Sequence, residues 1–337
     1  MTLHSFEVYP FRAYDGFVCN LWRLRNDADT PRGPVMLVHG AGVSANIFNP
    51  PNTSNLLDAL ARAGYDVWLE NWRGSIVFQP NQWDLDQVAE NDHPAAVAEI
   101  LRQTQASSLK AIIHCQGSTS FMISAVRGLV PEVSTILSNA VSLHPVVPAF
   151  SNFKLRYLLP FVRSLTDYLN PAWGLHAPNG TARFFRTMVE LTHWENDTKV
   201  GKMTSFTYGA GHPALWELEN LSPETKSWIQ ESFKAVPISF FEHIKKCVRA
   251  GVLVSRDGSR NYGKMHPATS ARFVFFTGKR NKCFLSKSQE ESFAFFNRLQ
   301  PAFHQLYEYE DYSHLDIFFG KNADKDIFPV MIRELNS

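Results

Sequence analysis

The sequence predicts an α/β fold, in which a mostly parallel sheet is flanked by helices and a helical segment is inserted into the core. Short apolar runs alternate with segments of helical spacing over residues 33–130, and this alternation is typical of parallel β/α/β units. The alternation stops at about His144 and resumes after about Pro267. The length of 337 residues is ample for such a core with an insertion.

The first half of the chain supplies most of the predicted strands. Residues 4–25 predict two strands joined at the turn Asp15-Gly16, and residues 33–42 predict a buried strand that ends in a glycine loop. Residues 55–74 predict an amphipathic helix, a stop at Gly64 and another buried strand. A helix with Pro94 near its start, a third apolar strand and a further helix follow, over residues 93–104, 109–115 and 118–130.

The second half predicts an insertion and then the end of the core. Residues 144–267 are rich in proline and aromatic residues and predict several helices and loops without strand alternation. A strand and loop, a helix, another strand and loop, and a final helix are predicted over residues 270–284, 288–299, 304–316 and 326–335. We therefore expect a first core part at 1–143, a helical cap at 144–267 and a second core part at 268–337.

The composition excludes several classes of function. Apolar residues make up 45% of the chain, charged residues 19%, and the net charge is +1, so nothing points to nucleic acid or an anionic membrane. No signal peptide or membrane span is visible, and the four cysteines form no CxxC pair. We expect a cytoplasmic protein without metal or cofactor. The 26 phenylalanines indicate a large core or an apolar pocket.

The stretch "IIHCQGSTSF", residues 112–121, indicates the site. An α/β-hydrolase presents its nucleophile on a tight strand-to-helix turn written G-x-S-x-G. Here Cys115 takes the central position, Gly117 keeps the second glycine and Ile113 replaces the first. A buried strand that ends in cysteine is also common in cores, because free cysteine packs as a small hydrophobe. By itself, the turn is therefore a weak signal.

A second loop strengthens the prediction of a nucleophile turn at Cys115. "LVHGAG" follows the first predicted core strand, where hydrolases of this kind place an amide of the oxyanion hole. The predicted donors are the backbone N–H groups of Ala41 and Gln116, although Gly40 and Gly42 also fit an ordinary loop. Losing one donor of such a pair costs about 2.7–4 kcal/mol of transition-state stabilisation.

The order of the chain also supplies a base and an orienting group. His314 lies in "DYSHLDIFFG", on a loop near the C-terminus where the base is expected after nucleophile and acid. The acid position, expected as G-x-x-D, holds "GKRN" with Asn281 in place of aspartate. A Cys-His-Asn set is chemically coherent, yet Asn281 also fits a plain turn. Asp316 and Asp311 are alternative orienting groups, ranked lower because they lie so close to His314.

The remaining candidates concern the pocket. His39 and His114 flank the predicted site and fit structural hydrogen bonding. His144 begins the predicted cap and could line the pocket. Three aromatic residues of the cap fit either a pocket wall or a simple cap core: Trp228, Phe240 and Phe241.

These motifs together resemble the acid-lipase branch of the α/β-hydrolases. "HCQGST" resembles the nucleophile turn of that branch, "YSHLDIFFGKNADKDIFPVM" its histidine loop, and residues 206–253 are similar to its cap. A closer resemblance, over nearly the whole chain, is to bacterial hydrolase modules fused to cholesterol-oxidase-like flavin oxidoreductases. It rests on "HGAGVSANIF", "GYDVWLENWRGS", "HCQGSTSFM", "SNAVSLHPVVP" and "GKRNKCFLSKS". The cysteine turn alone also resembles that of polyhydroxyalkanoate synthases.

The resemblance implies the α/β-hydrolase fold with a helical cap and an acyl-enzyme mechanism. The aromatic cap indicates a bulky apolar acyl or alcohol group, so we expect a small hydrophobic acyl substrate in a largely apolar pocket. The resemblance implies a functional link to a flavin oxidoreductase, although we expect no flavin domain within these residues. The cysteine, Ile113 and Asn281 depart from the pattern and argue against simple lipase activity. The leading hypothesis is an esterase or thioesterase with a Cys-His-Asn triad. The alternatives are an acyltransferase or lactone-forming cyclase, and a non-catalytic binding module.

Overall fold

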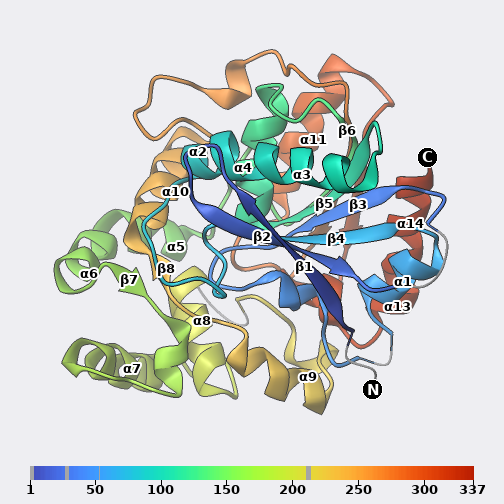
Figure 1. Ribbon diagram of the computed structural model, residues 1–337. Coiled ribbons are helices and arrows are strands. Elements are labelled where there is room, and N and C mark those ends of the chain that lie inside the picture. The colour runs from blue at the N-terminus through green and yellow to red at the C-terminus, as the bar shows by residue number, and fades with distance from the viewer. Residues whose placement is uncertain (1–3, 27–29, 53, 210–213) are drawn as a thin grey trace.

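The computed structural model describes residues 4–26, 30–52, 54–209 and 214–337. Its centre is an eight-stranded sheet in the order β1-β2-β4-β3-β5-β6-β9-β10 (Figure 1). The strands are β1 (Phe6–Arg12), β2 (Val18–Leu24), β3 (Pro34–Val38), β4 (Asp66–Asn71), β5 (Leu109–His114), β6 (Val133–Asn139), β9 (Arg272–Gly278) and β10 (Gln305–Tyr309). From β4 to β10 every neighbouring pair is parallel, whereas β1 and β2 pair antiparallel at one edge. The predicted fold class is thus confirmed.

The central strands are buried along their whole length. Every residue of β3 and β4 is buried, and β5 has one partly exposed position, Lys110. Near-continuous apolar runs are what a parallel sheet covered on both faces requires. The β1–β2 hairpin turns at Asp15-Gly16 as predicted, and Gly16 adopts a φ of +93°, a left-handed conformation that favours glycine.

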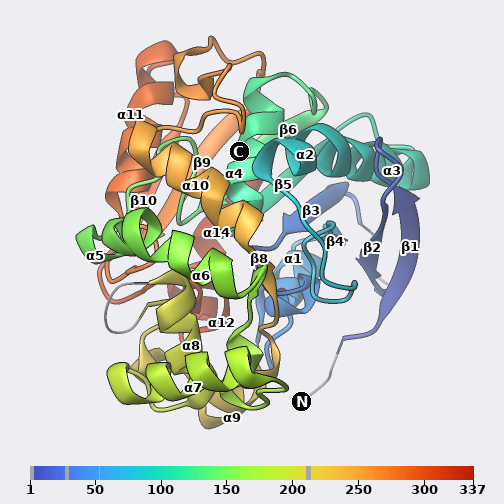
Figure 2. The ribbon, with the colours of Figure 1, turned by 90° about the vertical axis from the view of Figure 1, so that its left-hand side faces the viewer.

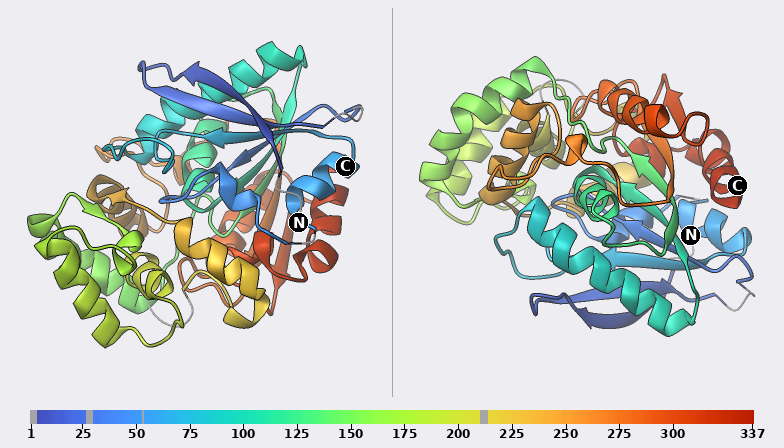
Figure 3. Two further views of the ribbon diagram at one scale, coloured as in Figure 1. Left: turned by 60° about the horizontal axis from the view of Figure 1, so that its bottom comes forward. Right: turned by 90° about the horizontal axis from the view of Figure 1, so that it is seen from above.

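Helices cover both faces of the sheet. In Figure 1, α2 (Leu85–Gln87), α3 (His93–Thr104) and α4 (Cys115–Val126) lie above the sheet, and α11 (Lys287–Leu299) packs against β9 and β10. On the other face, α1 (Leu56–Arg62) contacts α14 (Phe328–Asn336), with α12 (Asp316–Phe319) and α13 (Ala323–Asp326) nearby. Figure 3 shows the same two layers from below and from above.

The chain between β6 and β9 forms a group of helices to one side of the sheet (Figure 2). Its helices are α5 (Ala149–Phe153), α6 (Leu159–Leu165), α7 (Gly180–Thr192), α8 (Lys199–Tyr208), α9 (Pro223–Trp228) and α10 (Ile238–Ala250), with a π-helical turn, η3 (Lys154–Leu158), between α5 and α6. We interpret this group as the cap. The sequence predicts helices and loops here, and the structure adds a two-residue strand pair, β7 (Tyr168–Leu169) with β8 (Val236–Pro237).

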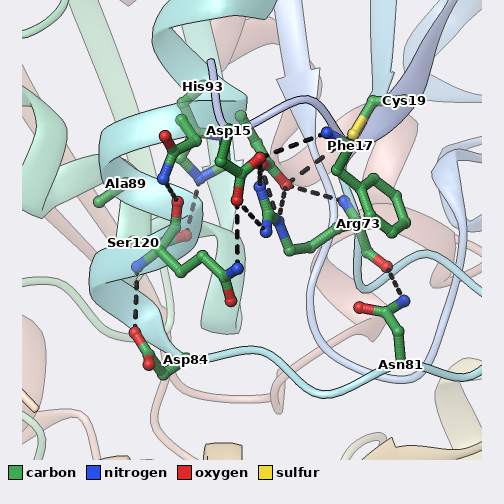
Figure 4. Close-up of polar contacts among 12 residues, drawn as sticks. Asp15, Phe17, Cys19, Arg73, Asn81, Asp84, Ala89, His93 and Ser120 are labelled. Carbon is green, nitrogen blue, oxygen red and sulfur yellow. Dashed lines mark hydrogen bonds and ion pairs between the residues drawn. The ribbon is translucent and has the colours of Figure 1, made fainter. Parts of the chain in front are cut away.

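A buried charge network fastens the edge hairpin to the core (Figure 4). The Arg73 guanidinium is 2% exposed; it donates to Asp92 on one side and, at 2.7 Å, to Asp15 in the hairpin turn on the other. This pairing holds the pKa of the Asp15 carboxyl down at about 2. A buried guanidinium needs two such partners because its desolvation is costly.

The helices in the described ranges lack the combination of length and hydropathy needed to cross a bilayer.

Candidate active site

Cys115 occupies a sharp turn between a strand and a helix. Strand β5 ends at His114, and helix α4 begins at Cys115 itself. The backbone of Cys115 has a φ of +55°, in the left-handed region that a non-glycine residue rarely adopts. Strain of this kind concentrates at functional sites. The turn also places the thiol at the N-terminus of α4, where the helix dipole favours negative charge.

Two glycines make this turn possible. A Cβ atom on Gly40 would lie 2.9 Å from the Cβ of Cys115, and one on Gly117 would lie 2.3 Å from the carbonyl oxygen of His39. Any larger residue would therefore push the glycine loop away from the turn. Ile113, which replaces the first expected glycine, is fully buried in β5 between its register partners Val38 and Ser138, so it belongs to the core of the sheet.

The Cys115 sulfur is surrounded by hydrogen-bond donors. A hydrogen bond from the Cys283 thiol, followed by the charge and hydrogen bond of His314 and the backbone N–H of Gln116, holds the pKa of Cys115 well below its ordinary value. The same hydrogen bond, together with burial, raises the pKa of Cys283 well above its ordinary value. Of the two thiols, Cys115 is thus the one whose surroundings favour the charged form, and Cys283 is the one that they keep protonated.

Cys283 is the residue of the site that the sequence analysis missed. It lies two positions after Asn281 in "GKRNKCF", and the only available signal was its closeness to the predicted acid position. All four cysteines are buried and free. The spacing of Cys115 and Cys283 along the chain gave no reason to pair them, yet the two loops that hold them meet at the same edge of the sheet.

Asn281 contacts His314, and the direction of its amide is defined. Its Oδ1 accepts hydrogen bonds from the backbone N–H groups of Cys283 at 2.9 Å and Phe284 at 3.1 Å. Its Nδ2 therefore faces the imidazole and lies 3.1 Å from His314 Nδ1. Since an amide nitrogen only donates, Nδ1 is the acceptor, and the proton of the neutral ring lies on Nε2.

The two alternative aspartates make other contacts. Asp316 is fully buried and accepts hydrogen bonds from the backbone N–H groups of Ser313 and Glu217 and from the side chain of Asn220; burial raises its pKa to about 6. Asp311 is exposed and pairs with Arg280. Asp316 thus fixes the loop that holds His314, while Asn281 contacts the imidazole directly.

The main cavity at Cys115 is largely apolar. Its empty volume is about 800 Å³, which includes space open to solvent. Its walls come from α5 to α6, the end of α8, α10 and the Asn281 loop. We call it the main chamber; its lining is Ala41, Cys115, Val147, Ser151, Lys154, Leu155, Leu158, Leu159, Val162, Leu169, Phe206, Thr207, Tyr208, Phe240, Phe241, Ile244, Cys283 and Phe284.

Cys115 also lines a second, smaller cavity, whose empty volume of about 250 Å³ includes space open to solvent. We call it the small chamber. It shares Ala41, Cys115 and Tyr208 with the main chamber and adds His314, while the Tyr208 hydroxyl donates to the Ala41 carbonyl oxygen at 3.2 Å. Cys115 therefore lines both a large apolar space and a small space next to the imidazole.

Of the remaining residues that the sequence suggested for the pocket, two line the main chamber and two do not. Phe240 and Phe241 line the main chamber. His144 instead lies beside Ser292 and Phe295 on α11, and Trp228 packs against Phe319 on α12. Neither lines either chamber, so their suggested place in the pocket was wrong. The reason is that contacts with α11 hold His144 and contacts with α12 hold Trp228.

The two flanking histidines have partners of their own. His39 Nδ1 bonds to the carbonyl oxygen of Gly40 at 2.7 Å, and burial lowers the pKa of His39 to about 3. His114 Nδ1 accepts from Asn139 Nδ2 at 2.9 Å, and burial also lowers its pKa. Both rings stay neutral.

His114, Cys115 and His314 each offer a ligand atom, all within 4.8 Å of one another, so this trio is where a transition metal could be held.

A second constellation resembles a hydrolytic triad but is closed to substrate. The Ser120 hydroxyl lies 2.7 Å from His93 Nε2, and His93 Nδ1 lies 2.7 Å from Glu70 Oε2. All three side chains are 0% exposed, and Ser120 lies inside helix α4 rather than at a turn. Figure 4 shows Ser120 and His93 among the helices of the core. This order of bonds satisfies buried polar groups and presents no nucleophile.

Comparisons with known proteins agree with this architecture. No family model matches the chain. Human lipase member K is 32% identical over 162 residues, which cover 43% of this chain and 40% of that lipase. Mouse lipase member K is 25% identical over 372 aligned positions, covering 98% of this chain and 89% of that protein. An esterase from Pyrococcus furiosus superposes with a TM-score of 0.54 at 12% identity, covering 99% of this chain and 92% of that structure.

The fold is therefore that of the α/β-hydrolases, as the parallel sheet, the flanking helices and the solved structures agree. The alignment with human lipase member K spans less than half of that lipase. The likeness to the archaeal esterase, at low identity, concerns the fold alone.

Proposed function

We propose that this protein is a cysteine-nucleophile α/β-hydrolase that cleaves a thioester or ester with a bulky apolar acyl group through an acyl-enzyme. The supporting observation is the Cys115 thiol on a left-handed turn at the start of α4, with donors around its sulfur and the main chamber beside it. A thiolate at a helix N-terminus is a working nucleophile at neutral pH. The lipases and esterases among the similar proteins agree with acyl chemistry.

The first half of the reaction needs little help from a base. The Cys115 thiolate attacks the carbonyl carbon, and the oxyanion that forms is held by the backbone N–H groups of Ala41 and Gln116. Collapse of this intermediate breaks the bond to the leaving group and forms an acyl-cysteine. A thiolate leaving group departs without a proton, whereas an alkoxide needs one.

The Asn281 amide favours thioesters over esters, because only an alkoxide leaving group needs a proton. Its NH₂ group donates to His314 Nδ1, so the proton of the neutral ring lies on Nε2. An amide brings no negative charge to support the proton that a departing alkoxide needs, so general acid catalysis of alkoxide departure is weaker than with a carboxylate at this position.

In the second half, the ring proton must first move from Nε2 to Nδ1, which breaks the hydrogen bond from Asn281. Nε2 then takes a proton from the attacking water, and collapse of the intermediate breaks the bond to sulfur and releases the acid and the Cys115 thiolate. We infer that this release of the acyl group is the slow step.

Acyl transfer is the second candidate. An acyl-cysteine is a thioester, which nucleophiles other than water attack readily. An acyl-cysteine that water releases slowly has time to meet such a nucleophile. A non-catalytic binding module would have no use for a strained thiolate beside an imidazole.

Two further proposals, a functional link to a flavin oxidoreductase and a cytoplasmic location, rest on the sequence. The motifs shared with modules of cholesterol-oxidase-like proteins support a functional link to a flavin oxidoreductase. A thiolate nucleophile also fits a reducing compartment, which supports a cytoplasmic location.

The proposal is tested with acyl-CoA, aryl ester and sterol ester substrates on purified protein. We expect turnover of the thioester, a rise in kcat/KM with acyl chain length, and an acyl adduct on Cys115 detected by mass spectrometry of the intact protein. Cys115→Ala should abolish turnover and adduct, and Cys115→Ser should react poorly. Cys247→Ala, which removes another buried thiol, is the matched control. Full turnover in Cys115→Ala would exclude the mechanism.

A further inference from the structure

Two hydroxyl groups lie buried in the main chamber without partners. Ser151 on α5 is 5% exposed and Thr207 on α8 is 7% exposed, and both line the chamber. Their Oγ and Oγ1 atoms have no hydrogen-bond partner within the described residues. Buried hydroxyls nearly always have one. An unpartnered hydroxyl in a cavity wall is a group that a ligand can satisfy.

Neighbouring hydroxyls show that these two are unusual for this chain. Thr204, on the same helix as Thr207, donates to the Gly201 carbonyl oxygen at 2.7 Å, and Ser292 donates to that of Ser288 at 2.8 Å. This local bond to the preceding turn is the ordinary solution for a helical serine or threonine. Ser205 is also unpartnered, but it does not line the main chamber.

Among the described residues that line the main chamber, Lys154 is the only cation. Its Nζ donates to the carbonyl oxygens of Phe206, at 2.6 Å, and Gly209, at the end of α8. An ammonium has three donors, so one is left after these two bonds. Burial lowers the pKa of Lys154 to about 8, so the group is still mostly protonated at neutral pH.

The three polar groups lie on adjacent parts of the wall. Ser151 and Lys154 are one helical turn apart, and Thr207 directly follows Phe206, whose carbonyl oxygen binds Lys154. Most of the remaining lining is aliphatic or aromatic. Of the two chambers, His314 lines only the small one. A leaving group that lies next to the imidazole therefore does not occupy the main chamber, which is free for the acyl group.

We propose that Ser151, Thr207 and Lys154 form a subsite for a neutral oxygen on the acyl chain, so that the preferred acyl group is an apolar chain with an oxo or hydroxy substituent away from the reacting carbonyl. This rests on the proposed function in placing the acyl group in the main chamber. A ketone oxygen accepts from the free donors, and a hydroxyl oxygen also donates to Ser151 or Thr207. The carbonyl oxygens of Phe206 and Gly209 already satisfy two of the three donors of Lys154, so one neutral oxygen satisfies the third.

Binding of free acids tests the subsite without any turnover. Wild-type protein is titrated by calorimetry with a saturated fatty acid and with its mono-oxo and monohydroxy derivatives, in which the oxygen is moved one carbon at a time. We expect at least one positional isomer to bind about tenfold more tightly than the plain acid, as for one or two added hydrogen bonds.

Variants then assign the effect to the subsite. The double variant Ser151→Ala/Thr207→Val should bind the plain acid as before and lose the preference, and each single variant should lose part of it. Lys154→Met should also reduce it. Ser205→Ala, which removes an unpartnered hydroxyl outside the chamber, should keep it, and circular dichroism verifies folding. Equal binding of all isomers, or a preference that survives the double variant, would overturn the subsite. Selective binding without turnover of the matching thioesters would overturn the proposed reaction alone.

Discussion

At the scale of single residues, the direction of one amide group sets the chemistry of the site. Two backbone N–H groups hold Asn281 Oδ1, so its NH₂ group faces His314. With one oxygen, an aspartate at this position would accept the same two backbone hydrogen bonds. With the other oxygen, it would accept a hydrogen bond from a protonated His314 Nδ1. The carboxylate would then stabilise an imidazolium, as the acid of a Ser-His-Asp triad does.

Asn281→Asp should therefore change which substrates react. We expect kcat/KM for an alkyl ester to rise about 10²-fold relative to that for the matching thioester, the lower end of a general acid contribution. Steady-state kinetics on a paired ester and thioester of one acyl chain measure this ratio. Asn281→Ala, which removes the orienting group altogether, should lower both rates. A fall of both rates in Asn281→Asp would contradict the assigned role.

Cys283 acts on the reaction through the charge of Cys115. Its thiol is the largest cause of the lowered pKa of Cys115, so removing it should raise that pKa. A higher pKa leaves less thiolate at neutral pH, while the thiolate is fully formed in both proteins at high pH.

In Cys283→Ala, the pH at which Cys115 becomes half alkylated by iodoacetamide at a fixed time should shift upward. Alkylation at high pH should approach that of the wild type, and Cys283→Ser, which keeps a donor, should shift less. Peptide mass spectrometry assigns the modified cysteine, and Cys247→Ala controls for loss of a buried thiol elsewhere. A profile that stays in place would show that Cys283 does not stabilise the thiolate.

At the scale of elements, the histidine loop is fastened to the segment before α9. The buried Asp316 carboxylate accepts from Ser313 in the loop at 2.8 Å and from Asn220 at 2.7 Å. A buried donor that loses its partner costs about 1–3 kcal/mol. The loop that positions His314 thus depends on a contact with the segment that we interpret as the cap.

Asp316→Ala should lower the free energy of unfolding by about 3 kcal/mol, because it leaves several buried donors unpaired. It should also lower kcat/KM, since His314 loses its fixed position. Asp311→Ala is the matched control, because its exposed ion pair with Arg280 is worth less than about 1 kcal/mol. Urea unfolding and steady-state kinetics measure both effects, and equal results for the two aspartates would exclude the fastening role.

At the scale of the whole molecule, buried charge joins the edge hairpin to the sheet and to α3. Asp92, which is 0% exposed, receives several hydrogen bonds from Arg73, and Arg73 in turn binds Asp15 in the hairpin turn. Breaking such a buried pair leaves a charge without compensation, at a cost of about 3–5 kcal/mol.

Asp92→Asn should therefore lower the free energy of unfolding by at least about 3 kcal/mol. Glu99→Gln, which removes the partner of the exposed Arg102, should change it by less than about 1 kcal/mol. Urea denaturation followed by tryptophan fluorescence measures both variants. A small loss in Asp92→Asn would mean that water or another side chain reaches Arg73.

The sequence by itself determined the sheet, the helices around it and the order of the site residues. These follow from local periodicity, and parallel strands bring residues after their carboxyl ends, such as Cys115 and Asn281, to one edge. Strand patterns at β3, β4 and β5 were clear because such strands are apolar throughout.

Only the tertiary structure decided how the site residues face one another. The pairing of Cys115 with Cys283 and the direction of the Asn281 amide depend on irregular loops, whose course has no repeating signal. The same holds for His144 and Trp228, which lie outside both chambers, and for Ser151 and Thr207, which line the main one. Side-chain direction in such segments is set by packing between residues far apart in the chain, and a local pattern contains no record of that packing.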